Sequence, residues 1–156
     1  FWYRYVFSNR TLIETGASDV VMKRRIEPTY SDYMGLVFEK VCRDYLMRKN
    51  PCGELPILFT SIGRWWGTDP KKHEQVEIDL IANDGDEYMF CECKWRNEKL
   101  DLPVLKSLMY KADVFRKNRG RTWFVLFSKS GFTDAVIEEA AKNNDVLLVD
   151  LGKITE

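Results

Sequence analysis

The clearest pattern of hydrophobic and polar positions lies between residues 75 and 95, which read QVEIDLIANDGDEYMFCECKW. Two alternating runs flank the turn sequence NDGD at 83–86. Because successive side chains of a strand point to opposite faces, each run has one apolar face and one face that carries charge. We predict a β-hairpin with a loop of about four residues over 84–87, in which Ile81 lies opposite Phe90.

The same register brings charged residues of the two runs together. It places Asp79 opposite Glu92 and Glu77 opposite Lys94, with cross-strand neighbours ~5 Å apart. Like charges at this spacing destabilise a sheet unless a cation or a proton intervenes. Mg²⁺ binds one or two carboxylates and keeps several waters, so we expect a Mg²⁺ site here, with Mn²⁺ as a substitute. The alternative is a solvated strand face with a Glu77–Lys94 ion pair.

The remaining pattern predicts an α/β domain. Apolar residues at helical spacing predict helices over 31–49, 101–117 and 134–142, and apolar runs predict strands at 61–67, 122–127 and 146–151. The order is helix, three strands, helix, strand, helix, strand, which favours a mixed central sheet flanked by helices. The core stripe predicted for the first helix, with Ser31 as its N-cap, is Met34, Phe38, Val41, Cys42 and Tyr45.

Residues 1–30 differ from the rest of the chain in their pattern. They begin with the aromatic-rich FWYRYVF and continue with mixed helical character. Proline disfavours helix in the residue before it, so we expect Glu27-Pro28 to end this stretch. The chain starts with Phe1 rather than Met, which favours a piece of a longer protein. We therefore divide it into a junction segment, 1–30, and a functional domain, 31–156.

Glu39 is a further candidate for the acidic patch. It lies about 100° round the predicted helix from Phe38, on the shoulder of the core stripe. A carboxylate in that position can reach over a sheet edge. The alternative is an exposed glutamate paired with Arg43 at i+4.

Composition restricts the partners that the chain can bind. Its 24 Lys and Arg residues balance 24 Asp and Glu residues, so nucleic-acid contacts must come from local patches. No apolar run is long enough to span a bilayer, so we expect no membrane contact. The four cysteines show no CxxC spacing, which fits a reducing cytoplasm. Candidate phosphate contacts are Arg64, Lys129 at a strand-to-helix turn, and Arg119 and Arg121; ordinary solvated turns are the alternative.

Asp79 followed by Glu92-Cys93-Lys94 resembles the D…E-x-K signature of the PD-(D/E)XK nuclease superfamily, with Ile78-Asp79 in place of Pro-Asp. The resemblance implies a restriction-endonuclease-like αβββαβ core and Mg²⁺-dependent hydrolysis of phosphodiester bonds in DNA. It implies Asp79, Glu92 and the backbone carbonyl of Cys93 as metal ligands, with Lys94 positioning the attacking water. Glu39 corresponds to a first-helix glutamate of many such nucleases, and Glu77 is a candidate outer ligand.

A second resemblance covers nearly the whole chain. The segments FWYRYVF, FEKVCRDYL, GRWWG, VEIDLIA, ECKW and LFSKSGFT, in this order, look like the C-terminal domain of archaeal and bacterial P-loop ATPases of the STAND-like type. This implies a domain that follows an ATPase and winged-helix region of the same full-length chain. The alternative function is then a noncatalytic domain that regulates the ATPase or forms a homodimer.

Overall fold

A computed structural model describes residues 1–115 and 120–155 and separates them into two compact units, Phe1–Leu36 and Val37–Glu156. No described helix is long and apolar enough to cross a lipid bilayer. The helices are α1 (Arg10–Glu14), α2 (Ser18–Val21), α3 (Glu27–Lys49), α4 (Leu102–Phe115), α5 (Asp134–Lys142) and α6 (Leu151–Thr155), with short π or 3-10 turns at Trp2–Val6, Phe7–Asn9, Met22–Ile26 and Asn50–Cys52. The strands are β1 (Ser61–Thr68), β2 (Gln75–Asp84), β3 (Glu87–Lys94), β4 (Thr122–Ser128) and β5 (Val146–Asp150).

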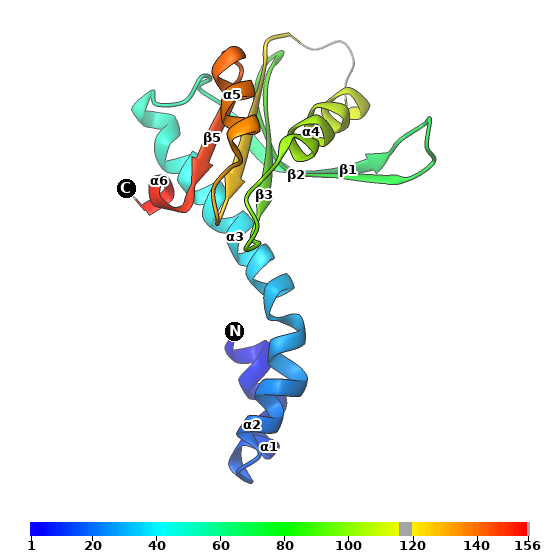
Figure 1. The fold of residues 1–156 in the computed structure, drawn as a ribbon, viewed down its shortest axis with the longest axis vertical. Coiled ribbons are helices and arrows are strands. Elements are labelled where there is room, and N and C mark those ends of the chain that lie inside the picture. The colour runs from blue at the N-terminus through cyan, green and yellow to red at the C-terminus, as the bar shows by residue number, and fades with distance from the viewer. Residues whose placement is uncertain (116–119, 156) are drawn as a thin grey trace. The chain divides into compact units, whose positions relative to one another are not determined.

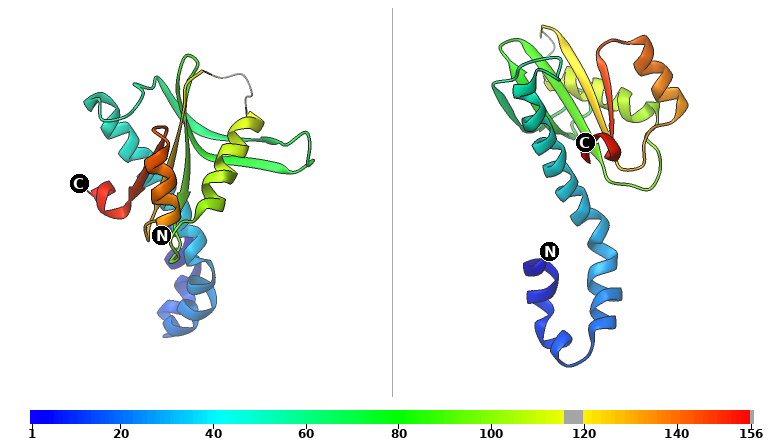
Figure 2. Two further views of the ribbon diagram at one scale, coloured as in Figure 1. Left: turned by 45° about the horizontal axis from the view of Figure 1, so that its top comes forward. Right: turned by 90° about the vertical axis from the view of Figure 1, so that its left-hand side faces the viewer.

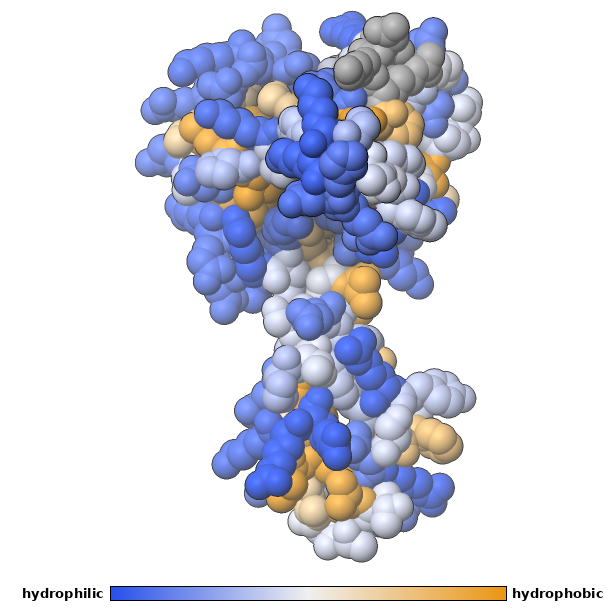
Figure 3. Space-filling model, turned by 90° about the vertical axis from the view of Figure 1, so that its right-hand side faces the viewer, coloured by the Kyte–Doolittle hydropathy of each residue, from blue (hydrophilic) through white to orange (hydrophobic). Residues whose placement is uncertain are grey.

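The first unit is helical throughout. The prediction that Glu27-Pro28 ends a helical stretch is wrong, because α3 begins at Glu27. Pro28 lies in the first turn of α3, directly after the π turn Met22–Ile26, so the chain stays helical across this proline. Ser31 is therefore inside the helix and does not cap it. The aromatic side chains of Phe1, Trp2, Tyr3 and Phe7 are all exposed. Figure 3 shows hydrophobic residues among hydrophilic ones on one face of the molecule.

The second unit is built on a five-stranded mixed sheet in the order β1-β2-β3-β4-β5 (Figure 1). The first three strands are antiparallel neighbours, and β4 and β5 continue parallel to β3. Antiparallel strands can follow each other through short turns, whereas the parallel pairs need the crossovers that α4 and α5 provide. The predicted mixed α/β architecture is thus confirmed. The C-terminal helix α6 was not predicted.

Both faces of the sheet are covered, as the views in Figure 2 show. The part of α3 after Val37 packs on one face, where Phe38, Cys42 and Leu46 join the core. Helices α4 and α5 pack on the other face. Two predicted details of α3 were wrong, because Val41 is exposed and Leu46 is buried. The alternative of a solvated strand face does not hold, since Asp79 and Glu92 are 9% and 4% exposed.

The pairing of β2 with β3 ends halfway along the two strands. Their ladder runs from Asp84–Glu87 to Leu80–Cys91 and includes the predicted Ile81–Phe90 pair. The loop has two residues, not about four, and Gly85 adopts a positive φ of 55° within it. Gly63 of β1 pairs with Ile81 of β2, and Trp65 pairs with Ile78. Two steps along β1 thus correspond to three steps along β2, so β2 contains one extra residue. Such a bulge bends a strand, and β2 leaves β3 here while it stays paired with β1.

Candidate functional site

Asp79 lies at the bulge where β2 leaves β3. The predicted pairs Asp79–Glu92 and Glu77–Lys94 lie beyond the end of the β2–β3 ladder. The Asp79 carboxylate takes the place of a strand partner, because the Cys93 N–H donates to its Oδ2 at 2.8 Å. The N–H and C=O of a strand residue point to the same edge, so the Cys93 carbonyl also faces the side that Asp79 occupies.

Glu92 is neutralised by two lysines. Lys94 Nζ lies 2.5 Å from Oε1, and Lys111 Nζ of α4 lies 3.1 and 2.9 Å from Oε1 and Oε2. Lys111 was not among the site residues predicted from the sequence, and its contact with Glu92 adds it to the site. Its position three residues after the buried Leu108 was the available signal, since residues at i and i+3 share a helix face.

The pKa values of Asp79 and Lys94 are both raised, for different physical reasons. Burial and then the Glu92 charge raise the pKa of Asp79, against the opposing Cys93 N–H and the two lysines. For Lys94, burial acts to lower the pKa, but the charge and hydrogen bond of Glu92 and the charge of Asp79 outweigh it and raise the pKa. Lys94 is therefore a cation at neutral pH. It can orient a water or stabilise an anion, but it does not serve as a proton acceptor.

Glu39 and Glu77 meet at Arg64 of β1. The Arg64 guanidinium donates to Glu39, and its Nε lies 3.0 Å from Glu77 Oε1. Glu39 thus reaches over to the sheet instead of pairing with Arg43. The alternative that Glu77 and Lys94 form an ion pair does not hold, since Glu77 pairs with Arg64 and Lys94 with Glu92. Burial and the Asp79 charge raise the pKa of Glu39, and the Arg64 guanidinium opposes them.

The other candidate phosphate contacts divide between the two ends of the sheet. Lys129 follows β4 beside the site, and its backbone N–H donates to the Lys94 carbonyl at 3.2 Å. Arg121 lies over the Trp123 ring at the start of β4. Because the β3–β4 ladder runs from Tyr88–Thr122 to Lys94–Ser128, Arg121 is about 20 Å from the Lys94 end. It does not join the acidic site, and Arg119 lies outside the described residues.

The donor set suits a hard divalent cation with few protein ligands. Within 1–115 and 120–155 no group of three or more Asp, Glu, His or Cys residues is arranged to hold a metal ion. Mg²⁺, however, commonly uses one or two carboxylates and keeps its waters. Asp79 and Glu92, together with the Cys93 carbonyl, supply such a set. A cation there would offset the charge repulsion that raises the Asp79 pKa.

We expect Glu92→Ala to destabilise the protein by about 2 kcal/mol, because it leaves two lysine charges without their carboxylate. The effect stays below that of a fully buried pair, since the side chains of Lys94 and Lys111 are 35% and 22% exposed and can rehydrate. Urea unfolding would measure it, with the exposed Glu98→Ala as the matched control. Equal midpoints for the two variants would contradict this account.

Asp79 should also make metal-free stability depend on pH. Its folded-state pKa lies above the unfolded value, so between the two values the folded state binds more protons. The free energy of unfolding therefore falls as pH rises through this window and recovers as pH is lowered. Melting temperatures of wild type and Asp79→Asn, compared from about pH 4 to pH 7, should differ most at neutral pH. A difference that is constant with pH would contradict the assignment to Asp79.

Three comparisons relate this chain to other proteins. It is 36% identical to "Uncharacterized protein MJECL04" of Methanocaldococcus jannaschii over 159 aligned residues, which cover 97% of this chain and 32% of that protein. The chain thus spans about a third of that relative's length. The crystal structure of protein of unknown function AF1548 is similar with a TM-score of 0.43 and 20% identity, over 70% of this chain and 58% of that one. Residues 2–106 match DUF234, described as archaea bacterial proteins of unknown function, and the chain therefore belongs to this family.

Proposed function

We propose that the unit Val37–Glu156 is a metal-dependent nuclease of the restriction-endonuclease-like, PD-(D/E)XK type, which hydrolyses phosphodiester bonds in DNA. The observation that carries this proposal is the convergence of two buried carboxylates, Asp79 and Glu92, with Lys94 at the bulge of β2. Buried like charges destabilise a fold unless something compensates them, and bulges are over-represented next to active sites. A purely structural role would be served better by apolar residues.

Each residue of the set has a chemical task in this proposal. Asp79, Glu92 and the Cys93 carbonyl would hold Mg²⁺ or Mn²⁺, with Glu77 and Glu39 as outer partners, directly or through water. The bound ion would polarise the phosphoryl oxygen and lower the pKa of a water molecule. Lys94 would orient that water, whose oxygen forms the new bond to phosphorus while the ester P–O bond breaks. Its ammonium would also stabilise the charge that develops on the phosphate, and the proton that the attacking water loses would pass through solvent to the leaving oxygen.

The unit would act within a larger protein. The relative from Methanocaldococcus jannaschii extends well beyond the matched third. We propose a P-loop ATPase region of the same full-length chain as the partner of this nuclease. DNA is the proposed substrate, and Arg64 and Lys129 are proposed to contact its phosphates.

A noncatalytic domain that regulates or dimerises the ATPase is the second candidate. Two observations favour it. Glu92 is already neutralised by Lys94 and Lys111, so the cluster is partly balanced with no metal bound. The chain also has no net positive charge to attract DNA. In this reading the carboxylates bind no cation, and variants that neutralise them leave every activity of the larger protein unchanged.

Cleavage of labelled single-stranded, duplex and branched DNA with Mg²⁺ or Mn²⁺ tests the proposal. Wild type is assayed beside Lys94→Ala and Lys106→Ala, purified identically, because Lys106 is an exposed lysine of α4. The nuclease proposal requires activity in wild type and Lys106→Ala that Lys94→Ala lacks. Equal activity in all three preparations would indicate a contaminating nuclease. Activity in none, with the full-length protein included, would favour the noncatalytic domain.

A further inference from the structure

Arg96 lies two residues beyond Lys94, in the segment between β3 and α4. Its Nε is buried and makes no hydrogen bond. In the described parts of the chain, no hydrogen bond or ion pair engages any atom of this side chain. A buried donor left without an acceptor destabilises a fold by about 1–3 kcal/mol, so this arrangement is unfavourable as it stands.

The backbone around Arg96 is nevertheless held firmly. We call residues 95–101 and 129–133, which follow β3 and β4, the double loop. Ser130 Oγ donates to the Arg96 carbonyl at 2.7 Å. Leu100 N–H donates to the Gly131 carbonyl, and Thr133 N–H to the Leu100 carbonyl, both at 2.9 Å. The loop therefore presents Arg96 from a fixed position, while the guanidinium itself is not tied by hydrogen bonds.

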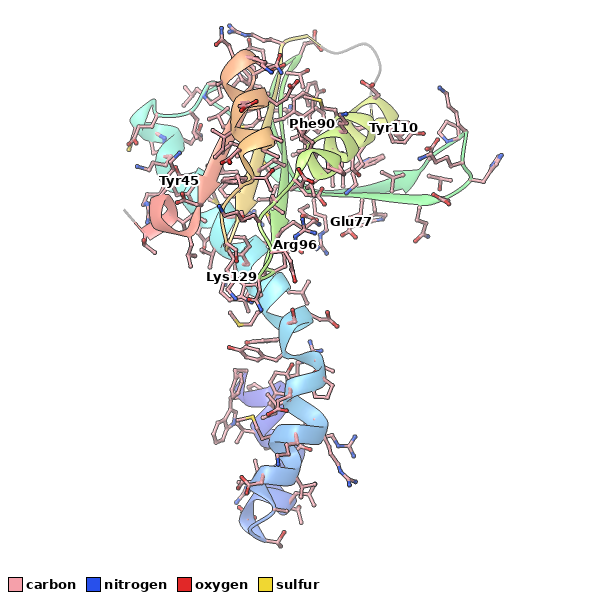
Figure 4. The ribbon with its side chains drawn as sticks, in the orientation of Figure 1. Tyr45, Glu77, Phe90, Arg96, Tyr110 and Lys129 are labelled. Carbon is pink, nitrogen blue, oxygen red and sulfur yellow. The ribbon has the colours of Figure 1, made fainter. Side chains whose placement is uncertain are left out.

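Arg96 and Lys129 of the double loop form no ion pair among the described residues, and the loop's three cations, which include Lys99, outnumber its two acids, Glu98 and Asp101, by one. Lys129 Nζ donates to the neutral Asn97 amide at 2.7 Å and lies 4.8 Å from the centre of the Trp95 ring. The exposed Glu98 pairs with neither Arg96 nor Lys129 in the part of the chain that the structure describes. Lys94 and Lys111, in contrast, are both paired with Glu92. Arg96 and Lys129 (Figure 4) follow the ends of β3 and β4, where Lys94 pairs with Ser128.

We propose that Arg96, together with Lys129, binds a backbone phosphate of the nucleic acid next to the bond to be cleaved. This proposal rests on the proposed nuclease function and adds Arg96 to the phosphate contacts, Arg64 and Lys129, that are proposed there. Arg96 is about 7 Å along the chain direction from Lys94. An arginine fork matches the geometry of a phosphate, and Nε would gain an acceptor there. Leaving the resting rotamer breaks no hydrogen bond, so the side chain can turn to the phosphate without that loss.

Binding in the absence of divalent metal separates this role from catalysis. Fluorescence anisotropy with a labelled oligonucleotide in EDTA compares wild type with Arg96→Met and Arg24→Met, the latter an exposed arginine of the first unit. We expect Arg96→Met to bind about tenfold more weakly. The slope of log Kd against log salt should fall by about 0.7 for single strands or 0.9 for duplex. Arg24→Met should bind like wild type.

Thermal unfolding supplies the second readout. Because the Nε of Arg96 is buried without a partner, Arg96→Met should melt at or above the wild-type temperature. Weaker binding with undiminished stability supports the proposal, even if wild type cleaves nothing. Unchanged affinity and salt slope in Arg96→Met overturn it, even if wild type cleaves DNA. A wild type that binds no oligonucleotide overturns it too, and an equal loss in Arg24→Met would show nonspecific attraction instead.

Discussion

Replacement of Lys94 by alanine should lower the rate of DNA cleavage by about 10²–10³-fold, the usual effect of removing one preorganised group that stabilises transition-state charge. The neighbouring carboxylates raise its pKa, so the ammonium is present throughout the neutral range. Its loss removes a positive charge from the place where negative charge develops on the phosphate. Single-turnover cleavage at saturating Mg²⁺ measures the chemical step directly.

Two companion variants make the Lys94 result specific. Lys94→Arg keeps the charge but changes its shape and hydration, so we expect partial recovery of the rate. Lys111→Ala removes the second ammonium that Glu92 contacts, and in our proposal this lysine compensates Glu92 without touching the substrate. A smaller loss of rate is therefore expected for Lys111→Ala. A greater loss there than in Lys94→Ala would transfer the proposed role to Lys111.

Mn²⁺ should raise the melting temperature of the wild type and leave that of Asp79→Ala unchanged. At about 100 times its Kd, a ligand of the folded state stabilises it by about 2.7 kcal/mol. For a chain of this size that corresponds to a shift of about 5–10 °C. The readout does not depend on cleavage, so it tests the metal site even if the substrate is unknown.

The Asp79→Asn variant sharpens the metal test. Its amide oxygen can still accept the Cys93 N–H, while the charge that repels Glu92 is gone. Without metal we expect it to melt a few degrees above wild type, about 2–4 °C for each kcal/mol of relief. With Mn²⁺ the order should reverse. A wild type that does not respond to Mn²⁺, or an Asp79→Asn that responds equally, would remove the metal from the proposed function.

Local sequence patterns were sufficient for much of the fold. The Ile81–Phe90 register follows from period-2 alternation on either side of a turn, which permits one pairing that keeps both apolar sets inside. The helix at 134–142 was predicted at its observed bounds, because its apolar spacing is regular and Thr133 marks its start. The mixed α/β order likewise follows from the succession of strand and helix periods.

The site itself depended on features that alternation does not reveal. A bulge is one extra residue in a strand, and the bulge in β2 places Asp79 beyond the end of the β2–β3 ladder, where strict alternation had predicted a pair with Glu92. Glu77 forms an ion pair with Arg64 of β1. Arg121 lies at the end of β4 that is far from Lys94. Two nearby carboxylates were expected. Their geometry was not.

The sequence by itself determined the order of the elements, the hairpin register and the presence of Asp79, Glu92 and Lys94 on neighbouring strands, because each rests on short-range periodicity. Only the tertiary structure decided that Lys111 reaches Glu92 from α4, that Glu39 meets β1 and that the buried Nε of Arg96 has no acceptor among the described residues. These contacts join residues far apart in the chain, and they depend on how helices pack across the sheet. A local sequence pattern does not specify such long-range contacts.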